Sequence, residues 1–218
     1  MPIVRIDTQW LYFAHVPKCA GSAVEDYLVA RFGPVGFLNR RFRKSPVRQR
    51  WSKSSPQHID ADTLAQIFPA DFFDLQFVVV RHPVDRLTSV FRFQRDIERS
   101  FPKKTTFAGW LDDLPERMVH NPYYLDNHVR PMSDMVPDAA EVLQLENGLD
   151  QVIAWLDTVA GNGDGPRAVK RSNSYKQRLE QFKRKAGPVP RITARARTKI
   201  AALYAADFER FGYERAAG

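Results

Sequence analysis

The sequence predicts an α/β fold: a single domain over residues 1–218, in which a central parallel sheet is flanked by helices. Strand-like and helix-like segments alternate along the chain, an order typical of right-handed βαβ units. The segment LQFVVV at 75–80 is a largely apolar, β-branched run, as expected for a strand that is buried on both faces. With 218 residues, 44% of them apolar, the chain is long enough for one large core.

Each expected element follows from its local pattern. Asp60 is a good N-cap for a short helix, and Pro83 suits the first turn of another. The expected strands are 10–16, 75–80 and 141–146, and the expected helices are 21–32, 60–68, 83–94, 149–160 and 197–213. Two stretches are expected to be irregular: a long basic loop at 31–57 and a proline-punctuated segment at 115–138.

Composition excludes several classes of protein. No apolar run approaches the roughly 20 residues that span a bilayer, and the N-terminal segment lacks the pattern of a secretory signal. The single cysteine, Cys19, cannot form an internal disulfide, which fits a reducing compartment. We therefore expect a soluble, cytoplasmic protein without a membrane span.

Positive charge is concentrated in two segments. The formal net charge is +8 and the pI is about 9.7. Residues 27–59 contain eight Lys and Arg and no acidic residue, and residues 167–199 contain Glu180 as their one acid. A single basic residue is usually a solvated surface group. Two whole segments without balancing acid indicate instead a positive field for an anionic ligand.

The turn PKCAGS at 17–22, between an expected strand and an expected helix, has three possible uses. It could simply connect the two elements, carry a catalytic cysteine, or cradle an anion. A helix N-terminus at the carboxyl end of a parallel strand offers free N–H groups and a positive dipole end. Lys18 adds a cation, Ser22 adds a hydroxyl, and Gly21 permits close approach of the backbone, so the pattern favours a phosphate-binding loop.

This loop is not the ATP-binding one, because GxxxxGK[ST] places lysine after its second glycine, whereas Lys18 precedes the single glycine here. A thiol at a helix N-terminus can be nucleophilic. A cysteine-phosphatase loop, however, places arginine six residues after its cysteine, and Glu25 stands there. We therefore expect Cys19 to be a small packing residue.

A second anion site is expected where strand 75–80 ends. Arg81 follows the strand, and Ser89 lies about two helical turns further on. A guanidinium can fork onto a phosphate while the hydroxyl donates to it. The alternative is an arginine–aspartate pair that ties the turn together, for which Arg86 and Asp85 are candidates. Two anion sites at two parallel strand ends indicate a ligand with two separated phosphates.

Four segments together resemble one protein family. HVPKCAGSAVE (15–25) resembles the 5′-phosphosulfate loop of sulfotransferases, and VVVRHPVDRLTSVF (78–91) resembles their 3′-phosphate motif. DNHVRPMSD (126–134) and LYAADFERFGY (203–213) are similar to segments of the carbohydrate branch, which includes heparan 2-O- and chondroitin sulfotransferases and small bacterial proteins. The four segments occur in the family's order, and they imply a P-loop-like nucleotide-binding architecture.

The resemblance implies transfer of a sulfuryl group from 3′-phosphoadenosine 5′-phosphosulfate (PAPS) to a hydroxyl acceptor, with PAP as the product. The acceptor is expected to be a small molecule or a glycan, and the basic loop suits an acidic one; no nucleic-acid partner is expected. The implied cofactor-binding residues are Pro17, Lys18, Cys19, Ala20, Gly21, Ser22, Ala23, Arg81, Ser89, Arg171 and Ser172.

The expected catalytic residues are Lys18, His58 and His128. Lys18 is expected to neutralise charge on the oxygen that bridges phosphate and sulfate. The resemblance implies that His58 is the general base, with His128 as the alternative. The other histidines are expected to be structural: His15, His82 and His120. No cluster in the sequence has metal-ligand spacing, so no catalytic metal is expected.

The sequence departs from the family pattern at two positions. Cys19 stands where threonine is frequent, and Met132 stands where glutamine is common after the Arg-Pro pair. Two other functions stay open. The segment RRFRKSPVRQRW at 40–51 fits a nucleic-acid-binding module, although that leaves both strand-end loops unexplained. A nucleotide kinase would share the fold but requires the ATP loop that this chain lacks.

Overall fold

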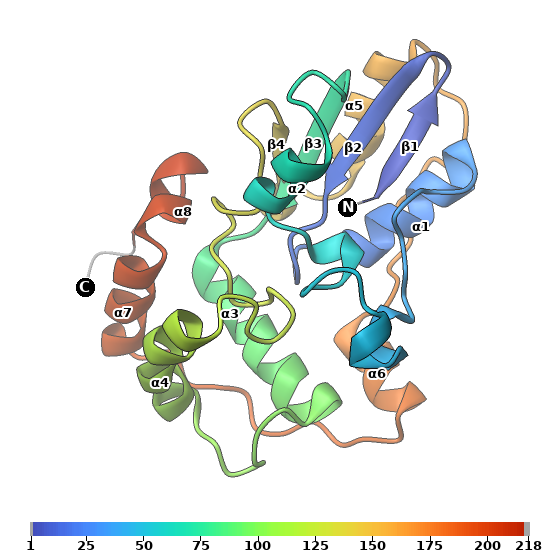
Figure 1. Cartoon of the computed structure of the whole chain (residues 1–218). Coiled ribbons are helices and arrows are strands. Elements are labelled where there is room, and N and C mark those ends of the chain that lie inside the picture. Colours follow the sequence, from blue (N-terminus) through green and yellow to red (C-terminus); the bar gives the residue numbers. More distant parts are fainter. Residues whose placement is uncertain (1, 216–218) are drawn as a thin grey trace.

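The structure is a computed structural model, and it describes residues 2–215. Four strands form one sheet, in the spatial order β1–β2–β3–β4 (Figure 1). The strands are β1 (Ile3–Ile6), β2 (Gln9–Ala14), β3 (Leu75–Val80) and β4 (Glu141–Gln144). The predicted α/β class is confirmed, with the sheet flanked by helices.

The three predicted strands pair in parallel, β2 with β3 and β3 with β4. The sheet is not wholly parallel, because β1 pairs antiparallel with β2 through a two-residue turn in which Asp7 has a φ of 50°. Strand β1 has four residues, a length too short to give a clear pattern, and it was not predicted. It covers the edge of β2 that the parallel strands leave open.

Helices lie in the long connections β2–β3 and β3–β4, and further helices follow β4. Their bounds are α1 (Gly21–Phe32), α2 (Ala61–Ile67), α3 (Pro83–Arg92), α4 (Phe107–His120), α5 (Asp150–Ala160), α6 (Tyr175–Gln181), α7 (Ala194–Leu203) and α8 (Ala205–Arg210). Helix α3 continues into a π-helical turn at Phe93–Glu98. The basic loop contains short 3₁₀ turns at Phe42–Lys44, Val47–Gln49 and Pro56–His58.

Two sequence-based expectations about helices are wrong. Residues 115–120 belong to α4 although Pro115 lies inside that helix. Burial of Trp110, Leu111 and Leu114 on the same helix outweighs the cost of the proline. The single closing helix is in fact α7 and α8, which break at Tyr204, whose hydroxyl donates to the carbonyl of Val129 at 2.6 Å.

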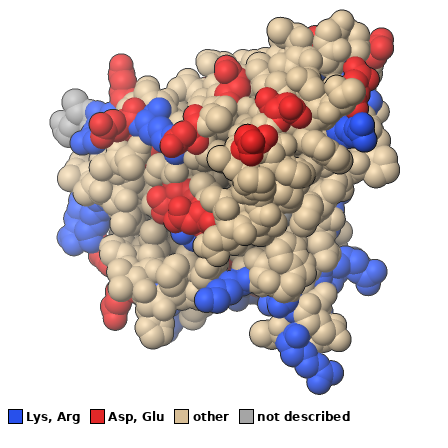
Figure 2. Space-filling view, turned by 45° about the horizontal axis from the view of Figure 1, so that its top comes forward, with Lys and Arg blue, Asp and Glu red and all other residues tan. Residues whose placement is uncertain are grey.

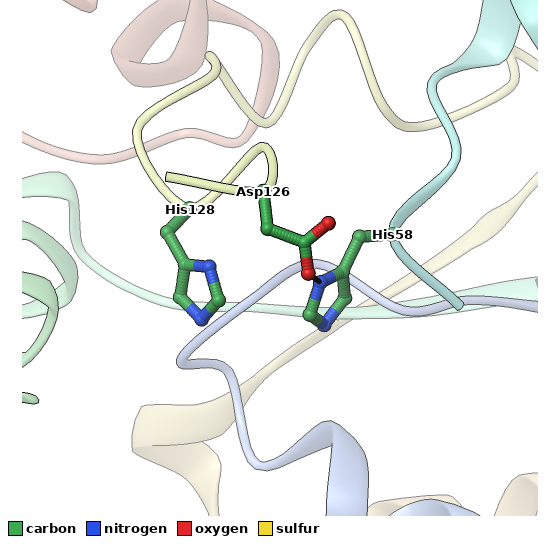
Figure 3. Close-up of side chains that lie close together, drawn as sticks. All are labelled: His58, Asp126 and His128. Carbon is green, nitrogen blue, oxygen red and sulfur yellow. Dashed lines mark hydrogen bonds and ion pairs between the residues drawn. The ribbon is translucent and has the colours of Figure 1, made fainter. Parts of the chain in front are cut away.

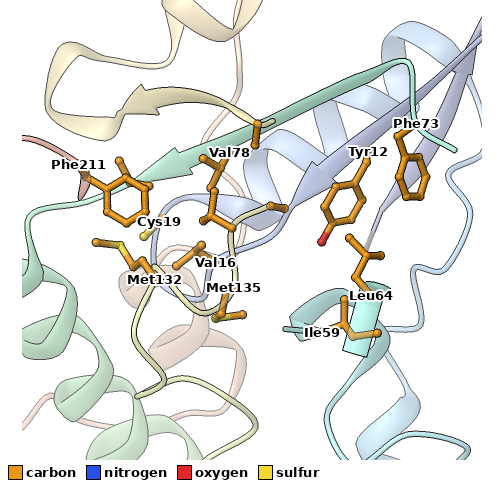
Figure 4. Packing of buried hydrophobic residues seen from close by; sticks show 14 of the residues in the cluster. Tyr12, Val16, Cys19, Ile59, Leu64, Phe73, Val78, Met132, Met135 and Phe211 are labelled. Carbon is orange, nitrogen blue, oxygen red and sulfur yellow. The ribbon is translucent and has the colours of Figure 1, made fainter. Parts of the chain in front are cut away.

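Alternation along the strands divides the core between the two faces of the sheet. Tyr12 and Val78 point to one face, which is covered by α2 and by residues 132–140 (Figure 4). Phe13 and Phe77 point to the other face, which is covered by α1 and α5. A third cluster joins α3, α4, α7 and α8 beside the sheet, in the lower left of Figure 1.

This arrangement brings the carboxyl ends of β2 and β3 next to the N-termini of α1 and α3. Charge is unevenly spread over the surface: on the face shown in Figure 2, acidic side chains gather over the centre and top, while Lys and Arg lie mainly at the left and lower edges. None of the helices within residues 2–215 is long and apolar enough to cross a membrane.

Candidate active site

A cavity of about 670 Å³ lies beyond the carboxyl end of β2, at the N-terminus of α1. Its volume is typical of a small-molecule site. The wall brings together segments that are far apart in the sequence: 15–25, 39–58, 93–98, 126–128 and 172–184. The basic loop and the second basic segment therefore both contribute to the wall of one cavity.

The structure brings most of the predicted site residues to this cavity. Those on its wall are Pro17, Lys18, Ala20, Gly21, Ser22, His58, His128 and Ser172. Those that lie off the wall are Cys19 and Ala23, which are buried beneath the loop, Arg81 and Ser89, which are half-buried, and Arg171, which is exposed. Contact of each residue with a ligand stays a prediction.

The loop that follows β2 has the backbone of an anion site. Lys18 and Ala20 both have positive φ, 69° and 63°, a geometry that turns successive N–H groups toward one side. Within residues 2–215 no side chain caps the N-terminus of α1; the Ala23 N–H donates to the Ala20 carbonyl, and the N–H groups of Gly21 and Ser22 remain available on the cavity wall. The hydroxyl of Ser22 accepts a hydrogen bond from the side-chain amide of Asn173, which lies in the second basic segment.

Gly21 is required for a different reason from the one that the sequence indicated. A Cβ atom at this position would lie 2.1 Å from ring atoms of His15, closer than any real contact. The glycine therefore leaves room for a histidine ring of the same chain rather than for a ligand alone. His15 was expected to be a packing residue, and it is buried, but it also faces the cavity.

Lys18 lies at the base of the cavity. Its Nζ is 4.0 Å from the centre of the Phe93 ring. Burial and, to a lesser extent, the charges of Arg81 and Arg178 lower the pKa of Lys18 to about 8. Arg81 is therefore close enough to lower the pKa of Lys18, although it is not on the cavity wall. An ammonium group held with so little water is poised to bind an anion.

Cys19 packs inward, as predicted, and contributes to the core on the α2 face of the sheet. Its thiol is 1% exposed, and burial raises its pKa to about 12. A thiol with this pKa is a poor nucleophile at neutral pH. Met132 is also buried in that core, where its N–H donates to Asp207.

The two predicted catalytic histidines are neighbours, with ring centres 5.1 Å apart (Figure 3). His58 Nδ1 is 2.9 Å from a carboxylate oxygen of Asp126. His128 Nδ1 is instead 2.5 Å from the carbonyl oxygen of Leu125. His15 lies on the far side of His58, with its ring centre 4.9 Å away, and its Nδ1 pairs with Glu25.

Burial controls the charge of this cluster. It lowers the pKa of His128 well below the ordinary histidine value, and the positive charge of His58 acts in the same direction. Burial also lowers the pKa of His15. For Asp126, burial raises the pKa, but the hydrogen bonds from His58 and from the Ser55 N–H act in the opposite direction, and the net shift is downward. Asp126 is therefore ionised at neutral pH.

Two residues of this site were missed at the level of sequence. Asp126 is one, because the motif DNHVRP drew attention to its histidine alone. Arg86 is the other. The sequence offered Asp85 as its ion-pair partner, and that alternative is wrong. Its guanidinium is fully buried and donates to the carbonyls of Pro17 (3.2 Å), His128 (3.1 Å) and Arg130 (2.8 Å). Arg86 thus joins the loop after β2 to the segment that carries His128.

The rim of the cavity is cationic on both sides. Arg40, Arg43 and Lys44 come from the basic loop, and Arg178 and Arg184 come from the second basic segment. Glu98 of the π-helical turn lies between them, 3.8 Å from Arg43 and 4.0 Å from Arg178. The excess of positive charge at the rim suits an anionic ligand.

The structure also assembles a group with the donor atoms of a metal site. One atom each of His58, Asp126 and His128 lie within 4.8 Å of one another, and these are ligand types that zinc and related metals accept. The spacing of residues along the chain gave no sign of this group, because His58 is 68 positions away from Asp126. Asp126 already accepts hydrogen bonds from His58 and Ser55. The absence of a catalytic metal stays a prediction.

The fold and the cavity are those of an α/β protein with a phosphate-type loop at a strand end. A sequence profile of the sulfotransferase family matches residues 1–214. The chain therefore belongs to the sulfotransferase family, and the prediction drawn from its four motifs is confirmed at that level. Searches of curated proteins and of solved structures gave no match.

Proposed function

We propose that the protein transfers the sulfuryl group of PAPS to a hydroxyl of a carbohydrate acceptor. The observation that carries the proposal is the placement of Lys18 and His58 on the wall of one cavity, at the N-terminus of α1. Group transfer to a hydroxyl needs a site that binds the donor and a base that takes the proton of the hydroxyl. The phosphate-type loop with Lys18 is suited to the first task, and a histidine paired to a carboxylate is suited to the second. Family membership supports the same chemistry.

The cavity fits a nucleotide of this kind. Its volume of about 670 Å³ is in the range of cofactor sites. Available N–H groups at the start of α1, the Ser22 hydroxyl and Lys18 form a donor set for an anionic group. Ser172 adds a further hydroxyl to the cavity wall, and Arg81 with Ser89 are the proposed partners of the 3′-phosphate.

Each residue has a defined task in the proposed reaction. PAPS supplies the sulfuryl group, which passes to the acceptor oxygen as the bond to the 5′-phosphate oxygen breaks. Lys18 and the loop N–H groups stabilise the negative charge that develops on that leaving oxygen. His58 takes the proton of the acceptor hydroxyl, and His128, which burial keeps neutral, positions the acceptor.

The acceptor is proposed to be a carbohydrate that already carries negative charge. Arg40, Arg43 and Lys44 on the cavity rim support an anionic acceptor, and the resemblance to the carbohydrate branch supports a sugar. A panel of acceptors with radiolabelled PAPS tests the proposal: acidic glycans, neutral glycans, a tyrosine peptide and simple phenols. Transfer to an acidic glycan is the expected result, and exclusive transfer to phenols would overturn the carbohydrate proposal.

The proposed role of Lys18 at the donor is tested by substitution. In Lys18→Ala we expect turnover to be lost while PAP affinity falls far less, because Lys18 acts mainly on charge that develops during transfer. Lys53→Ala is the matched control, since Lys53 is exposed in the same basic loop region and lies against Tyr123 rather than in the cavity. Full activity in Lys18→Ala contradicts the mechanism, and tighter binding of ATP than of PAP favours the kinase alternative.

A further inference from the structure

Residues 125–127 form a left-handed turn that no glycine occupies. Leu125, Asp126 and Asn127 have φ values of 54°, 61° and 62°. L-residues rarely adopt this conformation, and three in succession are rarer still. Such backbone persists where the surrounding contacts hold it in place, and it is concentrated at functional sites.

The turn is held by hydrogen bonds to Ser55 and to His58, and Figure 3 shows the contact between Asp126 and the His58 ring. The Asp126 carboxylate accepts from the N–H and the hydroxyl of Ser55, at 2.6 Å and 2.7 Å, and from His58 Nδ1 at 2.9 Å. The side-chain amide of the next residue, Asn127, is fully buried and donates to the backbone carbonyl of His58 at 2.8 Å. The turn therefore forms hydrogen bonds with both the ring and the backbone carbonyl of His58.

These contacts determine where the ring proton lies. An ionised carboxylate only accepts hydrogen bonds, so His58 must donate from Nδ1. A neutral His58 then carries its proton on Nδ1 and a lone pair on Nε2. Figure 3 shows the Nε2 atoms of His58 and His128 on the same side, away from the Asp126 carboxylate. His128 donates to a carbonyl instead, so of these two histidines it is His58 that has a carboxylate behind its ring.

We propose that Asp126, held by the left-handed turn at residues 125–127, is a positioning residue that fixes His58 in the Nδ1–H tautomer and leaves Nε2 as the proton acceptor. The catalytic role of this positioning rests on the proposed function, whereas the contacts that fix the His58 ring do not depend on it. When the acceptor oxygen bonds to sulfur, its proton moves to His58 Nε2, and the Asp126 carboxylate stabilises the resulting imidazolium. Asp126 itself stays ionised throughout.

The test has a readout that does not depend on turnover. In the ¹⁵N-histidine spectrum of the full chain, assigned with His58→Gln and His128→Gln, we expect a protonated Nδ1 and an unprotonated Nε2 for neutral His58. In Asp126→Asn the side-chain amide can donate to Nδ1, so the two signals of His58 should exchange their character. Asp126→Glu restores an acceptor-only partner and should restore the original pattern.

Activity supplies the second readout. Asp126→Asn should lower kcat by about 10²- to 10⁴-fold, the usual worth of a correctly presented base, with KM for PAPS changed less than about threefold. Asp126→Glu should recover part of kcat. Asp134→Asn is the matched control, because its half-exposed carboxylate lies in the same segment and pairs with Arg130 instead. We expect it to keep both the spectrum and the activity of the original chain.

The outcomes separate the two proposals. An Nε2–H tautomer of His58 in the unsubstituted chain overturns the positioning role, whether or not any variant folds. The same holds if Asp126→Asn folds and keeps the original kcat. If the tautomer behaves as expected but no acceptor receives a sulfuryl group, the positioning stands and the proposed function fails.

Discussion

Binding of PAP should weaken as the pH rises from 7 to 9, because Lys18 loses its proton in that range. Burial lowers the pKa of Lys18 to about 8, so the empty site is about 90% protonated at pH 7 and about 10% at pH 9. The direction follows from the chemistry: the protonated form binds an anion, so affinity is highest below the pKa. The phosphates of PAP contribute little, since their second pKa is about 6.

The size of the effect follows from the contact that is lost. A hydrogen bond to a charged group is worth about 1.5–3 kcal/mol, so protonated Lys18 should strengthen PAP binding at least about tenfold. Weighting the two forms by their populations gives a rise in Kd of about fivefold or more between pH 7 and pH 9. In the bound state Lys18 should keep its proton, so binding at pH 8–9 takes up protons.

Isothermal titration calorimetry of PAP at pH 7, 8 and 9 measures both quantities. Repeating the titration in buffers of different ionisation enthalpy gives the number of protons taken up. Lys18→Arg is the matched control, because arginine stays charged throughout this range and should give a flat Kd. A flat Kd in the unsubstituted chain, with no proton uptake, would falsify the assignment of Lys18 as the buried cation that meets the phosphate.

Four further results are expected. Arg81→Ala should raise the KM for PAPS at least about tenfold with a smaller change in kcat, as for a residue that binds both ground and transition states; an unchanged KM would place the 3′-phosphate elsewhere. Arg86→Lys should lower the free energy of unfolding by about 2–4 kcal/mol in urea titrations, because buried carbonyls lose their donors; an unchanged midpoint would contradict this. Iodoacetamide should leave Cys19 unmodified in the folded chain at pH 8 and label it after unfolding, and rapid labelling of the folded chain would restore the cysteine alternative. Activity should survive a metal chelator; a loss that added zinc reverses would show that His58, Asp126 and His128 hold a metal.

Local patterns were enough to predict most elements of the sheet and several of the helices beside it. The apolar run at 75–80 and the cap at Asp60 are signals carried by neighbouring residues, and β3 and α2 form where those signals lie. The junction after β2 was predicted for the same reason. The helix α4 was not, because a proline is a strong local sign of a break, whereas the burial that overrides it depends on other helices.

The contacts inside the site could not be predicted in this way. Asp126 meets His58 across 68 positions of sequence, through three successive left-handed residues, a conformation that Asp and Asn adopt singly but that local pattern does not predict as a run. Arg86 reaches three carbonyls from separate segments, while its neighbour Asp85 was the obvious partner by proximity in sequence. Contacts of this kind depend on tertiary packing, and local sequence propensity does not predict them.

The ring of His15 has a consequence for anyone who wishes to redesign this protein. It rests against Gly21 on one side and meets the edge of His58 on the other. Any side chain added to the loop at position 21 pushes that ring toward the proposed base. Altering the loop to accept another donor nucleotide would therefore disturb proton transfer as well. Other residues of the cationic rim, such as Lys44 and Arg184, lie outside this group of rings and offer the safer place to change which acceptor is recognised.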